Sequence, residues 1–172
     1  AEFIIVYPHW GIEYQMTEAS WQREIAQKLC DMGVDAIIGG HPHVIEPVDV
    51  FTSEDGTHKT FCAFSLGNQL SNQRREMMRL KTGNTEDGLF IDLEITRNKK
   101  GDVSLTGVKY IPTWVYKNAS GPTYSIVPVD DPSTVEEKTG IKGIQAQAQA
   151  SYDRTYKIIG DGVNKVSEAY GF

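Results

Sequence analysis

Three of the four histidines in this 172-residue chain occur where metal chemistry could take place. His9 follows one short apolar run, and His41 and His43 follow a second. Neutral imidazole is a ligand for Zn, Fe, Mn and Ni ions in proteins. Two such rings can hold one metal ion or reach two ions roughly 3.5–4 Å apart. His9, His41 and His43 are therefore the predicted metal ligands and catalytic residues.

The spacing of the second pair predicts how the two rings are placed. Pro42 favours an extended backbone at the residue before it, and in an extended segment residues i and i+2 project to the same side, roughly 6–7 Å apart. We therefore expect His41 and His43 to face one point. The alternative is that the histidines only make local hydrogen bonds at the starts of loops. His58 follows a distal turn and is expected at the surface.

Two predicted strands and one predicted helix would bring these histidines together. Residues 3–7 and 36–39 are continuous apolar runs, as in strands buried on both faces. Residues 17–32 have the period of an amphipathic helix, with Thr17 as N-cap and Gly33 as the stop. A strand, helix and strand in this order imply parallel pairing. Ligands gather beyond the C-terminal ends of parallel strands, where all three histidines would lie.

The buried face of that helix is expected to carry Trp21, Ile25 and Leu29, with Ala26 beside them. Antiparallel strands are expected to dominate residues 44–129, beginning with a hairpin that turns at residues 53–56. Ser133 and Glu136 fit a capping box at the start of a helical end. Gly160 and Gly162 are expected to split the helix predicted after residue 141.

Short motifs in this chain resemble those of one protein family. Residues 9–14 read HWGIEY, residues 39–44 read GGHPHV and residues 65–68 read SLGN. In this order and spacing they resemble the CapA family of poly-γ-glutamate capsule biosynthesis proteins (PGA_cap). The resemblance covers nearly all of residues 3–130. Gly40 departs from it, because many members have a further histidine there.

The resemblance implies a fold. The CapA family is similar to the calcineurin-like metallophosphoesterases, which have a β-sandwich with flanking helices and a two-metal centre at a sheet edge. We therefore expect an α/β fold with α+β character. The GD and NH motifs of the family's N-terminal half do not occur here in their expected context, because Gly160-Asp161 lacks an upstream strand and lies near the end of the chain. We therefore expect that half to be absent. Residues 1–130 would form the C-terminal part of the CapA, metallophosphatase-like domain, and residues 131–172 a C-terminal helical segment.

The resemblance also implies a role in poly-γ-glutamate capsule biosynthesis, with two possibilities left open. One is a metal-dependent hydrolase acting on a phosphoester-type bond. The other is a non-catalytic accessory or polymer-binding subunit of a membrane capsule synthase. The implied cofactors are two divalent metal ions, drawn from Mn, Zn, Fe and Mg. Without its N-terminal half, the chain alone is expected to be inactive.

The implied partners are an anionic substrate or polyglutamate, membrane synthase subunits, and the N-terminal half of the same domain. The implied location is the extracellular face of the bacterial membrane, with an anchor in the missing N-terminal segment. The net charge of −6 argues against a nucleic-acid partner. The chain begins inside a predicted strand, without a signal peptide, so we expect an upstream truncation.

Three further residues near the predicted ligands have two interpretations each. Glu13 would orient a ligand histidine or contact substrate, or it would only stabilise the start of the helix. Asn68 would contact substrate or support a ligand, or it would only form a turn. Trp10, like Tyr14, would line the pocket or pack in the core.

Two other groups of side chains need a structure to interpret them. The basic residues after the SLGN motif would face an anionic group or lie on a solvated helix face; they are Arg74, Arg75, Arg79 and Lys81. Cys30 and Cys62 lie in apolar surroundings and are expected to be free buried thiols, although the sequence does not exclude a disulfide.

Overall fold

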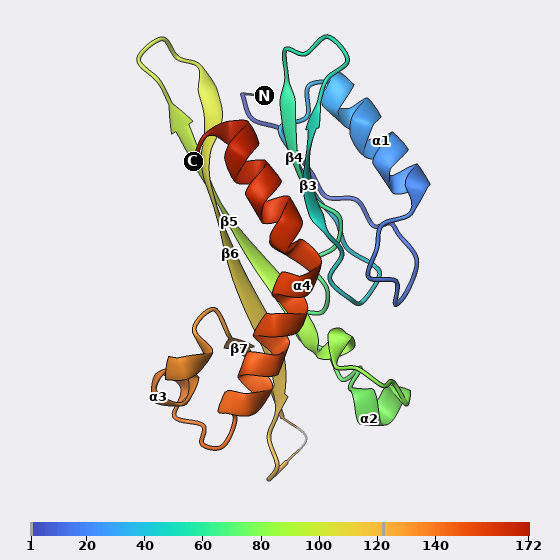
Figure 1. The fold of residues 1–172 in the computed structure, drawn as a ribbon, viewed down its shortest axis with the longest axis vertical. Coiled ribbons are helices and arrows are strands. Elements are labelled where there is room, and N and C mark those ends of the chain that lie inside the picture. Colours follow the sequence, from blue (N-terminus) through green and yellow to red (C-terminus); the bar gives the residue numbers. More distant parts are fainter. Residues whose placement is uncertain (1, 122) are drawn as a thin grey trace.

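The computed structural model describes residues 2–121 and 123–172, which form two sheets with helices packed around them (Figure 1). The first sheet has the strand order β1-β2-β4-β3 and the second has the order β5-β6-β7. The predicted α/β fold with α+β character is confirmed, because a mixed sheet and an antiparallel sheet occur in one chain.

The bounds of the elements are as follows. The first sheet contains β1 (Ile5–Val6), β2 (Ala36–Ile38), β3 (Val48–Thr52) and β4 (Lys59–Ala63). The second contains β5 (Asp87–Arg97), β6 (Val103–Lys117) and β7 (Tyr124–Pro128). The helices are α1 (Ser20–Asp31), α2 (Arg75–Met78), α3 (Val135–Thr139) and α4 (Gln145–Tyr170), with 3₁₀ turns η1 (Asn84–Glu86) and η2 (Pro132–Thr134).

The unit of β1, α1 and β2 has the predicted parallel pairing, with Ile5 opposite Ala36. The expectation that the first strand is buried on both faces is wrong. β1 is the edge strand of its sheet, and Ile5 and Tyr7 are 52% and 69% exposed. The apolar run identified a strand correctly. The burial of that strand, however, depends on its place in the sheet, and the run does not predict that β1 lies at the edge.

The buried face of α1 includes Ala26 as predicted, but it is centred one residue further along the chain than the predicted face. Trp21 and Ile25 remain 40% and 39% exposed, whereas Gln22, Ala26 and Cys30 are fully buried. The small side chains of Ala26 and Cys30 let the helix lie close to the sheet. The helix also begins at Ser20 rather than at the predicted Thr17.

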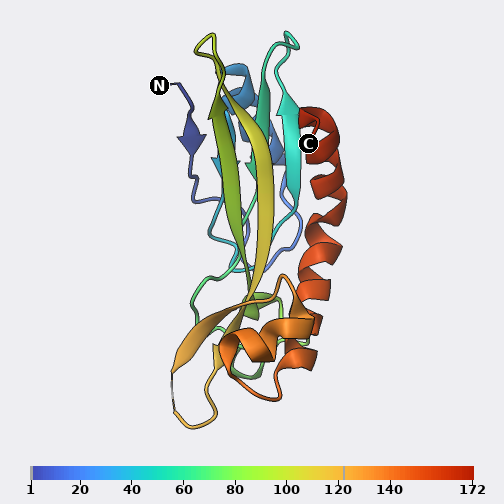
Figure 2. The same cartoon turned by 90° about the vertical axis from the view of Figure 1, so that its left-hand side faces the viewer.

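The two sheets share one hydrophobic core, and α4 runs alongside both of them (Figures 1 and 2). That core is formed by Ala36, Ile45, Val48, Phe61, Ala63, Leu89, Leu105, Ile159 and Val166. A second core lies between α1 and the other face of the first sheet, and it includes Cys30 and Cys62 as free buried thiols, as predicted. The first sheet is therefore covered on both faces at its inner strands, β2 and β4, which holds β2 in place.

The predicted break in the C-terminal helix is wrong, because α4 is continuous. Gly162 lies where the helix crosses β3, and a Cβ built on it would be 1.8 Å from the carbonyl oxygen of Val48. Glycine is thus required for close packing at this crossing, and tertiary contacts outweigh its low helix propensity. The proposed division of the chain at residue 130 stays a prediction.

The predicted capping box at the start of the helical end is also wrong. The side chain of Asp131 accepts the backbone N–H of Ser133. Glu136 instead accepts the backbone N–H groups of Ile144 and Gln145, at the start of α4. This carboxylate therefore caps the next helix rather than its own.

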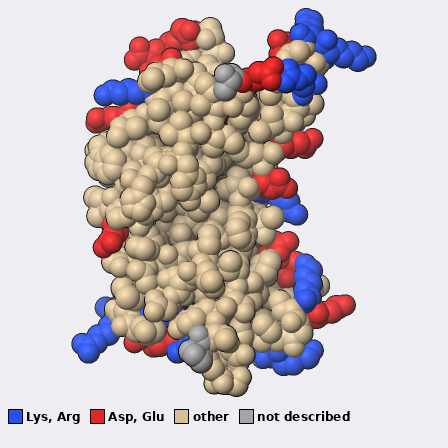
Figure 3. Space-filling view, turned by 180° about the vertical axis from the view of Figure 1, so that it is seen from behind, with Lys and Arg blue, Asp and Glu red and all other residues tan. Residues whose placement is uncertain are grey.

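One face of the molecule carries few charges. Figure 3 shows that charged side chains lie mainly around the rim of this face and that its centre is uncharged. Among the described residues, no helix is both long enough and apolar enough to cross a membrane.

Candidate metal site

The three predicted ligand histidines lie together beyond the ends of β1 and β2. The parallel pairing of these strands continues in an isolated bridge between His9 and Gly40. The N–H of Trp10 donates to the carbonyl of Gly40 at 2.9 Å. The ring centroid of His41 is 4.5 Å from that of His9 and 6.3 Å from that of His43. The paired strand ends therefore bring the three imidazoles together, while their binding of metal stays a prediction.

The backbone of this histidine turn is not extended as predicted. His41 and His43 have φ values of +119° and +60°, in the region that L-residues rarely adopt. Tyr14 on the facing loop has φ +65°, so this edge holds three of the four non-glycine residues with positive φ in the described part of the chain. Such strained residues cluster at functional sites, where the surrounding structure holds them. Steric preference before proline was therefore a poor guide at this turn.

Two of the other predicted site residues approach His43. Its Nδ1 is 3.1 Å from Oδ1 of Asn68, and its Nε2 is 3.9 Å from Oε1 of Glu13. The ring of Tyr14 stacks on the imidazole with 5.9 Å between centroids and 23° between planes. Of the two interpretations given for Asn68 and Glu13, contact with a candidate ligand is the one that the geometry favours.

Trp10 is the predicted site residue that the structure does not bring to the histidines. Its indole is buried in the core, stacks on Phe64 and donates Nε1–H to the carbonyl of that residue at 2.8 Å. Trp21 packs against its edge. Trp10 therefore anchors the start of the loop that carries Glu13.

The SLGN turn places Asn68 beside His43. Gly67 has φ +68°, and a Cβ on it would be 2.6 Å from the carbonyl oxygen of Asp87, so the turn can press against the start of β5. The Nδ2 of Asn68 then donates to the carbonyls of His43 and Thr85 at 3.1 and 3.0 Å. Asn68 is thus held from both sides, by the histidine turn and by η1.

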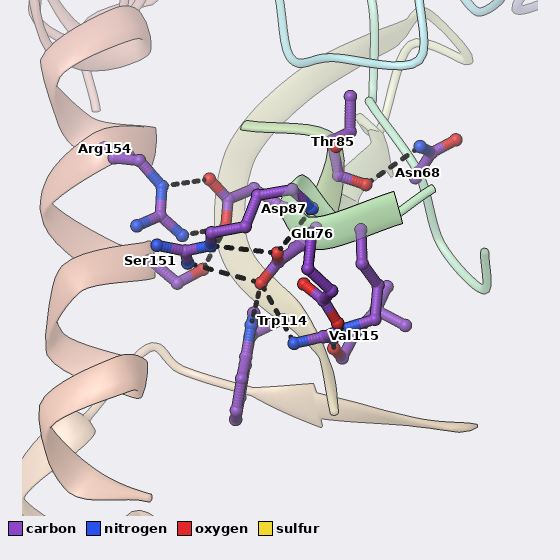
Figure 4. Close-up of polar contacts among 11 residues, drawn as sticks. Asn68, Glu76, Thr85, Asp87, Trp114, Val115, Ser151 and Arg154 are labelled. Carbon is purple, nitrogen blue, oxygen red and sulfur yellow. Dashed lines mark hydrogen bonds and ion pairs between the residues drawn. The ribbon is translucent and has the colours of Figure 1, made fainter. Parts of the chain in front are cut away.

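A buried ionic network lies directly behind this turn (Figure 4). Asp87 accepts two hydrogen bonds from Arg154 at 2.7 Å and one from Ser151, both residues of α4. Its neighbour Glu86 accepts hydrogen bonds from Arg75 and the indole of Trp114, and forms an ion pair with Arg74 at 3.4 Å. The network joins α4 to the segment that supports Asn68. The sequence offers only two adjacent acids before a strand, and nothing in it identifies their partners.

These partners decide the ionisation of Glu86. Burial alone would raise the pKa of this carboxyl group, but hydrogen bonds from the side chain and backbone of Arg75, and from Trp114, outweigh it and lower the pKa. Glu86 is therefore held as a carboxylate. Two residues of the basic cluster, Arg74 and Arg75, are thus paired, and the guanidinium of Arg74 also donates to the carbonyl of Val115. Arg74 and Arg75 thus stabilise the fold, and the alternative of a solvated helix face does not describe them.

A further buried carboxyl group, which sequence reasoning missed, lies beneath the histidine turn. Glu46 is fully buried; its Oε2 accepts from Gln22 at 2.9 Å, and its Oε1 has no hydrogen-bond partner among the described residues. Gly11 lies close to both this carboxyl group and the histidine turn, since a Cβ built on Gly11 would be 2.8 Å from Pro42 and 3.3 Å from that Oε1. Burial raises the pKa of Glu46 to about 7. The sequence signal that could have identified Glu46 is the position of an acidic residue within an apolar stretch.

The donor set at this edge suits a divalent cation in its chemistry. Imidazole nitrogen and carboxylate oxygen are ligands of zinc, manganese and iron. Within the part of the chain that the structure describes, however, no three side chains among His, Cys, Asp and Glu are arranged to hold an ion by themselves. The residues present therefore fit part of a metal site.

Comparison with known proteins points to the same motifs. Residues 1–73 match the family described as bacterial capsule synthesis protein PGA_cap. The chain is thus similar to the PGA_cap family over these residues. The match contains all of the first sheet, α1, all four histidines and the SLGN turn. The predicted CapA-family resemblance is therefore confirmed.

Two CapA relatives extend this result. The chain is 31% identical over 108 residues to the PGA biosynthesis protein CapA of Bacillus subtilis (strain 168), a match that covers 63% of this chain and 25% of that protein. It is 34% identical over 73 residues to the capsule biosynthesis protein CapA of Bacillus anthracis, covering 42% of this chain and 16% of that protein. The matched part thus spans at most a quarter of these relatives.

Proposed function

We propose that this chain supplies the histidine side of a divalent-metal site in a CapA-type capsule biosynthesis protein, and that the site hydrolyses a phosphoester-type bond. The convergence of His9, His41 and His43 on one sheet edge, in a strained turn, carries the proposal. The match of residues 1–73 to the PGA_cap family and the names of the two relatives support the role in poly-γ-glutamate capsule biosynthesis.

In this proposal His9, His41 and His43 hold the metal, with Glu13 close enough to assist. Two bound divalent ions, of Mn, Zn, Fe or Mg, would polarise the phosphoryl group and supply a hydroxide for attack. The remaining ligands come from outside these 172 residues, from the N-terminal half of the same domain. The exposed apolar edge of β1 supports a further segment packing there, because open edges of this kind invite strand pairing.

The second candidate is a non-catalytic subunit that binds polyglutamate or another anionic partner within a membrane capsule synthase. The incomplete ligand set among the described residues favours it, because a partial site can serve structure or binding without turnover. Both candidates place the protein at the extracellular face of the bacterial membrane, anchored through an N-terminal segment. Neither involves nucleic acid, in keeping with the net charge of −6.

One experiment separates the two candidates. The parent protein is assayed against p-nitrophenyl phosphate esters with added Mn²⁺ or Zn²⁺, beside the variants His41→Ala and His58→Ala. His58 is the matched control, because its ring bonds to the backbone of Val34 and lies away from the histidine turn. We expect metal-dependent turnover that His41→Ala abolishes and His58→Ala retains.

Metal binding without turnover, together with binding of polyglutamate, would favour the accessory role and refute the hydrolase. The 172-residue chain alone is expected to show no turnover. A strong metal-dependent rate from it would refute the claim that ligands from elsewhere complete the site.

A further inference from the structure

The orientation of the Asn68 amide follows from its partners. One terminal atom of this side chain lies 3.1 Å from the carbonyl oxygen of His43 and 3.0 Å from that of Thr85. A carbonyl oxygen can only accept a hydrogen bond. This atom is therefore the NH₂ nitrogen, and the other terminal atom is the oxygen.

The position of the proton on His43 follows in turn. Its Nδ1 lies 3.1 Å from Oδ1 of Asn68, which can only accept, so Nδ1 donates and carries the hydrogen. In neutral imidazole only one ring nitrogen carries a hydrogen. We infer that Asn68 is a positioning residue that holds His43 in the Nδ1–H tautomer and leaves the lone pair of Nε2 free to bind a cation.

Two further side chains fix this arrangement. Gln73 accepts from the Asn68 amide at 3.0 Å and donates from its own amide to the hydroxyl of Tyr14 at 3.4 Å. The Tyr14 ring stacks on the imidazole of His43. These contacts form a closed set that runs from Asn68 through Gln73 and Tyr14 to His43 and back to Asn68. The set fixes both the plane of the imidazole and its tautomer.

The free nitrogen faces a second acceptor. The Nε2 of His43 is 3.9 Å from Oε1 of Glu13, on an accessible part of the surface. In the Nδ1–H tautomer both atoms present lone pairs, and a cation would satisfy both. This last step rests on the proposed function, whereas the tautomer rests on hydrogen bonding alone.

The same chain contains an internal control. The Nε2 of His58 lies 2.8 Å from the carbonyl oxygen of Val34, so in that ring Nε2 carries the hydrogen. His43 and His58 are therefore expected in opposite tautomers. An unfolded chain would show no such difference between the two rings.

The test is a ¹⁵N NMR spectrum of the histidine rings in the metal-free 172-residue chain. The buffer is made more alkaline until the ring shifts no longer change, and signals are assigned with His43→Gln and His58→Gln. We expect a protonated Nδ1 in His43 and a protonated Nε2 in His58. A spectrum in which both rings carry the hydrogen on Nε2 overturns the inference.

Two variants separate positioning from folding. Asn68→Asp keeps an acceptor for Nδ1–H, and Asn68→Leu removes it, while both lose the donor to Thr85. We expect the Nδ1–H tautomer in Asn68→Asp and the Nε2–H tautomer in Asn68→Leu. If His43 in Asn68→Leu keeps the wild-type tautomer, Asn68 does not set it.

Titration of the parent protein with Zn²⁺ completes the test. Partners of ligand histidines typically contribute about 10- to 100-fold to metal affinity, so we expect a loss of that size in Asn68→Leu and a smaller one in Asn68→Asp. Equal affinities in wild type and Asn68→Leu would overturn the positioning role. A wild-type protein that binds no metal would refute the proposed function but leave the tautomer result standing.

Discussion

The buried carboxyl group of Glu46 leads to a pH-dependent prediction. Burial raises the pKa of Glu46 from its ordinary value of 4.5 to about 7, and the hydrogen bond from Gln22 offsets this only in part. Each unit of pKa corresponds to about 1.4 kcal/mol. Ionising Glu46 in the folded protein therefore costs about 3 kcal/mol.

The sign of the effect follows from proton binding. Between pH 4.5 and pH 7 the folded protein retains a proton on Glu46 that the unfolded chain has released. Stability therefore decreases as the pH rises through this range. Below this pH range Glu46 is protonated in both the folded and the unfolded chain. Above it the full cost of ionising Glu46 in the folded protein applies.

The perturbation is Glu46→Gln, which keeps the size of the side chain and its bond with Gln22 but cannot ionise. We expect the variant to unfold with nearly the wild-type free energy at pH 5. At pH 8 we expect it to be more stable than wild type by about 2–3 kcal/mol. Urea denaturation at both pH values measures this difference, and other titrating groups cancel because they are shared.

Glu24→Gln is the matched control, because it makes the same chemical change at an exposed acid of α1. If wild type and Glu46→Gln show parallel stability curves between pH 5 and pH 8, then Glu46 titrates normally. The reasoning from its burial would then be refuted.

Two other predictions concern how α4 is attached. Asp87→Ala leaves the guanidinium of Arg154 without its carboxylate and should destabilise the fold by about 3–5 kcal/mol, measured by chemical denaturation; a loss below 1 kcal/mol would mean that the pair is not buried in solution. Gly162→Ala should destabilise by about 1–3 kcal/mol, since its Cβ would meet the Val48 backbone, whereas Gly160→Ala, with open space, should stabilise by up to about 1 kcal/mol. Thermal melts that rank these two variants in the opposite order would contradict the close crossing.

Local patterns predicted the elements that deliver the histidines. Apolar runs identified β1 and β2, and the intervening periodicity identified α1. Because strand and helix formation depend on short-range periodicity, a sequence alone carries this information. The motifs around His9, His41 and Asn68 indicated the family for the same reason, since each is contiguous.

Other features depended on contacts between distant segments. Whether β1 is exposed, which face of α1 is buried and whether α4 continues past Gly162 are all decided by neighbours far away in the sequence. The left-handed backbone of the histidine turn is a similar case, because surrounding packing holds a conformation that local preferences disfavour.

For the candidate site, the amino-acid sequence by itself determined which side chains can donate to a metal and which strand ends they follow. Only the tertiary structure decided that Asn68 orients His43, that Trp10 belongs to the core, and that Glu46 is buried beneath the turn. Donor chemistry belongs to each residue and can be read along the chain. Orientation and burial are properties of pairs of groups, which the folded chain brings together from positions far apart.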